Sequence, residues 1–317
     1  MGKKTKRKRM WILYILLFLV GLVGTIYVVY NSDIRKAFQL VEARSNLMET
    51  PHGNIEYAET GEGSPVLILH GAGGGYDQGL LIGQIFLGDN VRIIAPSRFG
   101  YLNSEQPQDY SLEAQTDALA ALLDELGLER VAVMAISAGG PSGLYFSQRY
   151  PERTEALIMV CAISYTDSLI EEDIKKLNFI FRIFDNDFLY WVTLKAFRKP
   201  ILDFMGVPGE LLNNLSHNDQ AFLDEILELM LPMSQRMPGI QIDVLRQIPG
   251  DFPYDQIAAP TLVLHAQDDA FVPLEQGINA STKIPEADMI IFEKGGHFLI
   301  GNMEELQKTI IEFLKAH

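Results

Sequence analysis

One segment of the chain, residues 131–140, places a serine between an apolar strand and a helix. Five apolar residues, 131–135, predict a buried strand, and residues 141–149 predict a helix. Ser137 lies between them, with Ala135 and Gly139 two residues away on either side. Small residues at these positions let a strand and a helix pack closely around a tight turn. The segment therefore predicts an α/β fold with a serine at the end of a strand, although plain strand–loop–helix turns share this pattern.

The rest of the chain alternates between strand and helix patterns. Further strands are predicted near residues 55–58, 66–70, 91–95, 156–161, 261–265 and 288–292, and the clearest helices at 112–126, 142–149 and 303–316. Such alternation predicts a mostly parallel sheet with helices on both faces. We expect one α/β domain built from residues 51–163 and 251–317, interrupted by a helical insertion at 164–250 that has no strand pattern.

Polar residues follow three other predicted strands. His70 and the glycine-rich residues 71–75 follow one strand, and the pair Asp268 and Asp269 follows a second. His297 follows the last predicted strand. Because ligands bind beyond the carboxyl ends of the strands in open α/β sheets, we expect these side chains and Ser137 to gather at one edge.

This order of serine, acid and histidine resembles the α/β-hydrolase superfamily, from about residue 53 to the C-terminus. The resemblance implies an α/β-hydrolase fold in which residues 164–250 form a cap, Ser137 is the nucleophile and His297 is the base. Aligning on the Val-Pro pair at 272–273 selects Asp269 as the acid and leaves Asp268 as the alternative. A serine hydroxyl needs such a base to accept its proton, and the base needs a carboxylate to hold its tautomer.

The resemblance also implies how the substrate is held. The backbone amides of Ala72 and Ala138 are expected to form the oxyanion hole, with Gly71 and Gly73 beside the substrate. Arg98 is a candidate contact for a substrate carboxylate, and the alternative is a structural arginine that ties loops together. Ala135 and Ala266 stand where related enzymes commonly carry glycine, which puts the local geometry in question.

No pattern in the chain predicts a cofactor or a metal ion. The sequence has neither the His-x-x-x-His spacing nor a pair of cysteines, and no Gly-Lys-Ser/Thr follows its glycine-rich stretches. Its single cysteine, Cys161, is expected to be a small buried hydrophobic residue. The leading hypothesis is a serine hydrolase that cleaves carboxylic esters through an acyl-enzyme. Cleavage of amide or carbon–carbon bonds and a catalytically silent ligand-binding protein are the alternatives.

The N-terminal segment predicts a membrane anchor. Residues 1–9 form a basic tail, residues 10–30 are uncharged and almost wholly apolar, and residues 31–50 form a connector of mixed charge. A helix over residues 10–30 would be roughly 31 Å long, enough to cross the hydrocarbon core of a bilayer. A cleaved signal peptide is the alternative, but no cleavage site of small residues follows the span. The excess of basic residues before the span predicts a cytoplasmic N-terminus and an extracytoplasmic hydrolase domain in the cell membrane.

Net charge limits the partners of the chain. The formal net charge is −15, and six of the 26 basic residues lie in the acid-free tail, which leaves −21 on the remainder. A body this acidic repels nucleic acid, so we expect no nucleic-acid partner. The expected partners are a small-molecule substrate with an apolar part, which the resemblance and the aromatic cap imply, and the membrane through residues 10–30. Aromatic residues in the predicted cap could form its core, line the substrate pocket or contact the bilayer: Phe179, Phe181, Phe184, Phe188, Tyr190, Trp191, Phe197 and Phe204.

Overall fold

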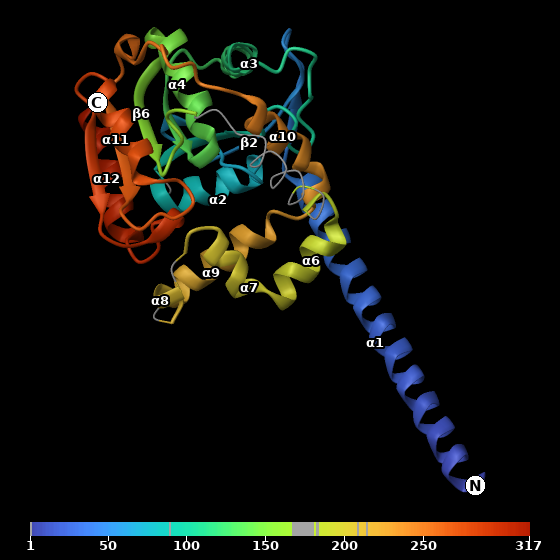
Figure 1. The fold of residues 1–317 in the computed structure, drawn as a ribbon. Helices are drawn as coiled ribbons and strands as arrows, with labels where there is room; N and C mark the ends of the chain where they lie inside the picture. Colours follow the sequence, from blue (N-terminus) through green and yellow to red (C-terminus); the bar gives the residue numbers. More distant parts are fainter. Residues whose placement is uncertain (1, 89, 167–180, 182–183, 208, 214) are drawn as a thin grey trace.

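The fold is built around one eight-stranded sheet (Figure 1). The computed structural model describes the whole chain except residues 1, 89, 167–180, 182–183, 208 and 214. The strands, listed in chain order, are β1 (Asn46–Met48), β2 (Ile55–Thr60), β3 (Ser64–Leu69), β4 (Val91–Pro96), β5 (Val131–Ile136), β6 (Thr154–Val160), β7 (Thr261–Ala266) and β8 (Asp288–Phe292). All seven predicted strands are confirmed; β1, which has only three residues, lies unpredicted in the expected connector.

The sheet is mostly parallel, as the sequence predicts. Its strand order is β1-β2-β4-β3-β5-β6-β7-β8, and only the β1–β2 and β2–β4 pairs are antiparallel. The parallel strands bring the carboxyl ends of β3, β5, β7 and β8 to one edge of the sheet. The loops that carry the candidate residues therefore all start from this edge.

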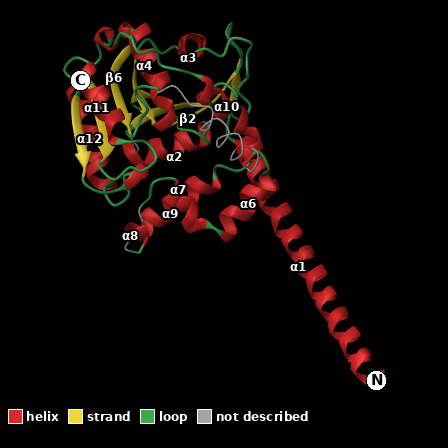
Figure 2. Ribbon diagram, viewed as in Figure 1, coloured by secondary structure: helices red, strands yellow, loops and turns green. Residues whose placement is uncertain are grey.

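Helices cover both faces of the sheet (Figure 2). Helices α2 (Tyr76–Leu87) and α12 (Met303–Ala316) pack together and contribute to the core on one face. The opposite face is covered by α3 (Leu112–Glu125), α4 (Gly140–Arg149) and α11 (Leu274–Lys283). The predicted helices at 112–126 and 142–149 match α3 and α4 to within two residues, and α12 matches its predicted range.

The predicted cap contains helices and, among its described residues, no strand. These helices are α6 (Asp187–Ala196), α7 (Arg198–Phe204), α8 (Gly209–Leu212), α9 (His217–Glu228) and α10 (Met237–Leu245). Of the cap aromatic residues, Phe179 lies outside the described residues. Tyr190 and Trp191 are buried in a cluster with Ile34, whereas Phe197 is exposed. The hydrophobic packing of the cap thus includes residues that precede the hydrolase domain.

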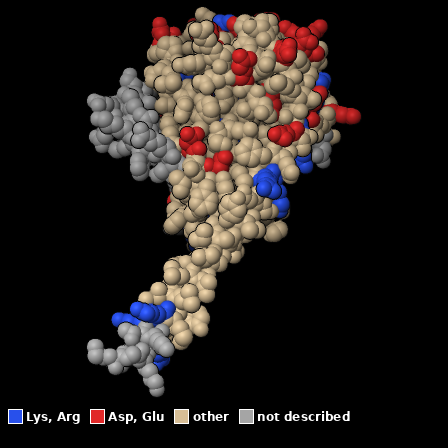
Figure 3. Space-filling model, turned by 90° about the vertical axis from the view of Figure 1, so that its right-hand side faces the viewer, with Lys and Arg blue, Asp and Glu red and all other residues tan. Residues whose placement is uncertain are grey.

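Helix α1 (Gly2–Ala43) runs without a break through the basic tail, the apolar span and most of the expected connector. The segment 31–43 contains no glycine or proline, and Ile34 and Val41, two turns apart on one face, are buried against the body. The first part of α1 projects away from the body, and Figure 3 shows lysine and arginine at its free end and again where it reaches the body. Between Arg7 and Ala43, α1 is long and apolar enough to cross a membrane, with a mean hydropathy of 2.7 over its most apolar 18 residues, a property that signal sequences share.

Candidate active site

Ser137 occupies a strained turn between β5 and α4. Its φ of 52° lies in the left-handed region, which a residue with a side chain adopts only when its surroundings hold it there. Two of these surroundings are glycines: a Cβ on Gly139 would collide with the carbonyl oxygen of Leu69, and one on Gly140 with that of Ile163. The carbonyl of Ser137 also accepts a hydrogen bond from the amide of Ile163 at 2.9 Å. The sequence therefore has small residues where the neighbouring backbones approach most closely.

The alanine at position 135, which stands where glycine is common, is accommodated by a glycine opposite it. A Cβ on Gly143 of α4 would lie only 2.6 Å from the Cβ of Ala135. The missing side chain in the helix makes room for the extra methyl group in the strand, so α4 still packs directly on β5.

Ser137, His297 and Asp269 form a hydrogen-bonded series. The Ser137 hydroxyl lies 2.9 Å from Nε2 of His297, and Nδ1 of His297 lies 2.8 Å from Oδ2 of Asp269. All three side chains are buried. With Nδ1–H donating to the carboxylate, Nε2 is free to accept the serine proton, and the carboxylate stabilises the imidazolium that results. This arrangement can turn a serine hydroxyl into a nucleophile.

The two adjacent aspartates have different partners. Burial raises the pKa of Asp269, but the stronger combined effect of hydrogen bonds from His297 and from the amides of Val272 and Phe271 holds this pKa below its usual range. Asp268 instead accepts hydrogen bonds from the amides of Gly296, at 2.8 Å, and Gly295, at 3.3 Å. The carboxylate of Asp269 therefore contacts the imidazole of His297 directly, whereas Asp268 contacts the loop that carries this histidine.

Two buried neighbours of Asp269 carry no sequence motif. Cys161 directly follows β6 with a φ of 44°, and burial, followed by the negative charge of Asp269, holds the pKa of its thiol well above the usual range. His265 lies 3.7 Å from Asp269 and contacts the carbonyl oxygen of Val272 through Nε2. Cys161 is buried, as predicted, but its place beside the carboxylate follows only from the sheet order, which sets β6 next to β7.

One group of side chains has the donor types of a metal site. Ligand atoms of Cys161, Asp269 and His297 lie within 4.8 Å of one another. In the structure the imidazole already contacts the Asp269 carboxylate through one nitrogen and the Ser137 hydroxyl through the other. This use of both nitrogens suits proton transfer between serine and histidine better than cation binding.

The glycine-rich loop after β3 lies against Ser137. A Cβ on Gly71 would stand 3.0 Å from that of Ser137, and one on Gly73 would stand 2.5 Å from Cε of Met230 in the cap. His70 bridges the base of this loop: Nδ1 donates to the Gly71 carbonyl at 2.7 Å, and Nε2 accepts from the Arg98 amide at 3.0 Å. The predicted substrate-facing glycines thus lie between the serine and the cap.

The Arg98 side chain is fully buried and bound to the protein itself. Its guanidinium forms a bidentate ion pair with Asp243 of α10, and Nε donates to the carbonyl oxygen of His70 at 3.0 Å. This geometry matches the structural alternative, in which the arginine ties the site loops to the cap, because both ends of its planar fork already have partners.

The cap also closes over the acid–base pair. The amide of His297 donates to the carbonyl oxygen of Gly206 at 3.1 Å. Gly206 itself has a φ of 73°, and a Cβ there would stand 3.3 Å from Oδ1 of Asp269. Contacts of this kind exclude water from the carboxylate, which strengthens its interaction with the imidazole.

Comparison with known proteins agrees with the fold. The sequence pattern of the alpha/beta hydrolase fold matches residues 64–302, which is most of the chain. A 2-hydroxy-6-oxo-2,4-heptadienoate hydrolase from Pseudomonas putida is 26% identical over 275 residues, covering 81% of this chain and 91% of that protein.

Two solved structures share the fold, each at a lower sequence identity than the Pseudomonas putida relative. An esterase from Thermogutta terrifontis is 24% identical, with a TM-score of 0.67 over 86% of this chain and 99% of its own. A bacterial membrane phospholipase A is 19% identical, with a TM-score of 0.66 over 97% of this chain and 98% of its own. Sheet order, serine turn and sequence pattern agree, and the chain belongs to the family of proteins with the alpha/beta hydrolase fold.

Proposed function

We propose that this protein is a membrane-anchored serine hydrolase that cleaves carboxylic esters. The observation that carries the proposal is the hydrogen-bonded series from Ser137 through His297 to Asp269, with the serine held in a left-handed turn at the edge of the sheet. The same series argues against a catalytically silent ligand-binding protein, because binding alone needs neither the strained serine nor the buried acid–base pair.

The proposed reaction proceeds in two halves. In the first, Oγ of Ser137 attacks the ester carbonyl carbon while Nε2 of His297 accepts the hydroxyl proton. The imidazolium then returns this proton to the departing alkoxide, so that an alcohol leaves and the acyl group stays on the serine. In the second half a water molecule gives a proton to His297 and attacks the acyl carbon, which releases the carboxylic acid and restores the serine hydroxyl.

The negative charge that develops on the carbonyl oxygen needs two donors. We assign these to the amides of Ala72 and Ala138. Support comes from the contact between Gly71 and Ser137, which brings the loop after β3 beside the nucleophile, and from the place of Ala138 directly after it. Preorganised backbone amides of this kind contribute about 10²- to 10³-fold each to the rate.

Hydrolysis of a carbon–carbon bond is the second candidate, because the Pseudomonas putida relative is named for a dienoate substrate. A dienoate carries a carboxylate, which a buried arginine would bind well. Among the described residues, the buried arginines beside the 71–75 loop are Arg98 and Arg236, and both are paired with aspartates. These pairs favour a neutral ester over an anionic substrate.

Ser137→Ala tests the enzyme assignment. We expect kcat on p-nitrophenyl butyrate to fall by about 10⁴-fold or more, and covalent labelling by a fluorophosphonate to disappear. Ser142→Ala, which removes another buried hydroxyl from the next helix, is the matched control and should keep the label. Labelling that persists in Ser137→Ala would refute the nucleophile. Rates on a panel of esters, aminoacyl amides and 2-hydroxy-6-oxodienoates then show whether the enzyme cleaves ester, amide or carbon–carbon bonds.

The anchor and its orientation are part of the proposal. Support comes from the length and hydropathy of α1, its exposed apolar surface and the basic residues at its free end. In intact cells, protease added outside should degrade the hydrolase domain, while the chain remains at full length in the membrane before treatment. Protection of the domain until lysis would overturn the orientation and leave the enzyme assignment standing.

A further inference from the structure

The loop of residues 71–75, to which we assign an oxyanion-hole amide, is rich in glycine and has little rigidity of its own. Four of its five residues are glycine, which restricts the backbone dihedral angles least. One end of the loop continues from β3, and the other runs directly into Tyr76, the first residue of α2. The position of the loop therefore depends in part on what holds Tyr76.

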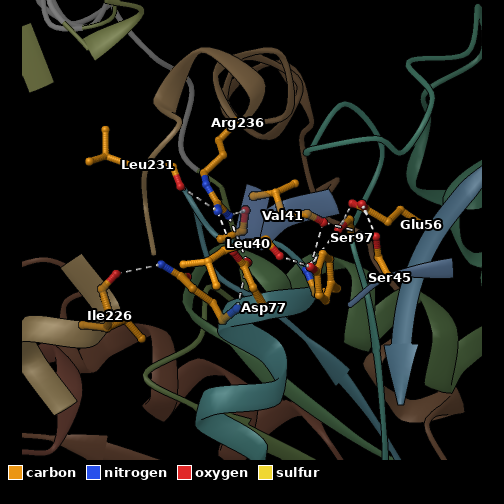
Figure 4. A network of polar contacts seen from close by, with 12 residues as sticks. Leu40, Val41, Ser45, Glu56, Asp77, Ser97, Ile226, Leu231 and Arg236 are labelled. Atoms are coloured by element: carbon orange, nitrogen blue, oxygen red, sulfur yellow. Dashed lines mark hydrogen bonds and ion pairs between the residues drawn. The ribbon is translucent and has the colours of Figure 1, made fainter. Parts of the chain in front are cut away.

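Tyr76 is held by the end of helix α1. Its buried hydroxyl contacts the carbonyl oxygens of Val41, at 2.8 Å, and Leu40, at 3.1 Å (Figure 4). Carbonyls in the last turn of a helix have no partner within the helix, so the phenol caps α1 at its C-terminal end. Burial raises the pKa of Tyr76 to about 12, which keeps the hydroxyl protonated and able to donate through the physiological range.

The backbone of Tyr76 is connected to α1 by a second route. Its amide donates to Oγ of Ser97 at 3.0 Å, and this hydroxyl donates to the buried carboxylate of Glu56 at 2.9 Å. Ser45, two residues beyond the end of α1, donates to the other oxygen of the same carboxylate at 2.8 Å (Figure 4). Both the side chain and the backbone of Tyr76 thus lead to residues 40–45.

The cap holds the same loop by separate contacts. Arg236 donates to the carbonyl oxygen of Gly74 at 2.7 Å and forms a bidentate pair with Asp77, at 3.1 and 2.6 Å. The side chain of Gln78 donates to the carbonyl oxygen of Ile226 in α9 at 3.2 Å. The cap contacts fix Gly74 and the start of α2, whereas the direct contacts to α1 pass through Tyr76 and Glu56.

We infer that the C-terminal end of α1 positions the 71–75 loop for catalysis, with Tyr76 as the positioning residue between them. The inference rests on the proposed function, since it concerns the amide of Ala72 in the oxyanion hole. In this inference α1 does more than tether the enzyme. Its last turn helps to position the Ala72 amide, which donates to the oxyanion in the transition state. A displacement of such a donor by about 1 Å can cost as much as 10²-fold in rate.

The test uses the full-length protein in detergent micelles and the variant Tyr76→Phe, which removes the hydroxyl and keeps the ring. We expect kcat on p-nitrophenyl butyrate to fall about 10-fold with KM within about twofold of wild type, because the oxyanion donor acts mainly in the transition state. The inhibition constant of a trifluoromethyl ketone, whose adduct with serine carries an oxyanion, should rise by a similar factor.

Tyr254→Phe is the matched control. Tyr254 is also buried and also donates its hydroxyl to a backbone carbonyl, that of Ser164, but it has no contact with the 71–75 loop among the described interactions. It should lower Tm by about as much as Tyr76→Phe while leaving kcat and the inhibition constant unchanged. Ser45→Ala, at a partly exposed position, removes the second route and should lower kcat about two- to threefold. If Tyr76→Phe does not fold, this variant tests the coupling in its place, and an unchanged kcat would overturn it.

The outcomes separate the two proposals. If Ser137→Ala is inactive and Tyr76→Phe keeps the wild-type kcat and inhibition constant, the coupling is wrong and the enzyme assignment stands. Equal losses of kcat in Tyr76→Phe and Tyr254→Phe would also overturn the coupling, because the effect would then be general destabilisation. If Ser137→Ala keeps full turnover, the proposed function falls, and the inference with it.

Discussion

The sheet edge that carries Ser137 and the junction at which α1, the start of α2 and the cap meet are held together in different ways. At the edge each functional side chain lies within a few residues of the carboxyl end of a strand, and the parallel pairing of β5, β7 and β8 with their neighbours brings them together. At the junction single side chains join elements that are far apart in the chain. Nε1 of Trp191 donates to Asp33 at 2.9 Å, and Arg236 pairs with Asp77.

Because of this difference, we expect substitutions at the edge to lower mainly kcat and substitutions at the junction to lower mainly the stability of the fold. Backbone hydrogen bonds fix the edge, so a change of one functional side chain there leaves the scaffold in place and removes chemistry. The junction combines a buried hydrophobic cluster with individual polar pairs, so a change in one of these pairs should alter stability first. The 71–75 loop is the place where the two regions meet, since it contacts Ser137 through Gly71 and the cap through Arg236.

The largest expected effect lies at the edge, where Asp269→Asn and Asp268→Asn can be compared. Asp269→Asn leaves His297 in the wrong tautomer and should lower kcat by about 10⁴-fold; Tm should fall as well, because the carboxylate accepts hydrogen bonds from two loop amides. Asp268→Asn should change kcat less than about 10-fold and lower Tm, because its carboxylate binds two loop amides. Steady-state kinetics and thermal unfolding of both variants provide the measurement, and the reverse ranking in kcat would exchange their roles.

A smaller effect, on stability, is expected at the junction from Arg236→Met. Removing the buried guanidinium leaves Asp77 largely buried without its partner, which should cost about 3 kcal/mol and lower Tm by roughly 5–10 °C. Asp77→Asn in the same background removes the uncompensated charge and should restore part of the loss. Thermal unfolding followed by circular dichroism measures both. No recovery in the double variant would show that the ion pair is not the source of the stability.

The pH dependence of stability is expected to come from two buried histidines at the sheet edge, His70 directly after β3 and His265 in β7. Burial, then Arg98, holds the pKa of His70 well below its usual range, and burial lowers the pKa of His265. Below about pH 6.5 the unfolded chain therefore binds protons that the folded protein does not, and stability is lost as the pH falls.

Each such histidine should contribute a loss of up to about 1.4 kcal/mol per pH unit below pH 6.5. Thermal unfolding between pH 7.5 and 5.5 measures this slope. A His265→Gln variant should show a shallower slope than wild type, and a variant with the unchanged slope would exclude His265 as a source. His52, which is exposed, offers the control substitution His52→Gln.

The smallest expected effect comes from Trp191→Phe, which keeps the ring packing at the junction and removes one hydrogen bond. Loss of the indole donor to Asp33 should cost about 1 kcal/mol and lower Tm by a few degrees, with kcat unchanged. Thermal unfolding and steady-state kinetics are measured on the same preparation. If kcat of Trp191→Phe fell as far as that of Asp269→Asn, the expectation that junction substitutions affect stability and not kcat would be wrong.

The sequence by itself determined most of the sheet and the candidate residues at its edge. Mostly apolar runs of four to six residues predicted seven strands because side-chain periodicity is a local property. Ser137 and His297 could be found because each stands in a short motif beyond a strand, and the Val-Pro pair selected Asp269 over Asp268. Hydrogen bonds that place Asp269 on the imidazole and Asp268 on loop amides agree with that selection.

Only the tertiary structure decided how the separate segments hold one another. The pairing of β1, the docking of residues 31–43 and the partners of Arg98 follow no local pattern. Arg98 and Asp243 are 145 residues apart in the chain, Asp33 and Trp191 are 158 apart, and Asp77 and Arg236 are 159 apart. Each side chain alone looks like an ordinary surface charge or cap aromatic. Its role arises only when the fold buries it beside a distant partner, because burial is what makes an unpaired polar group costly and a paired one specific.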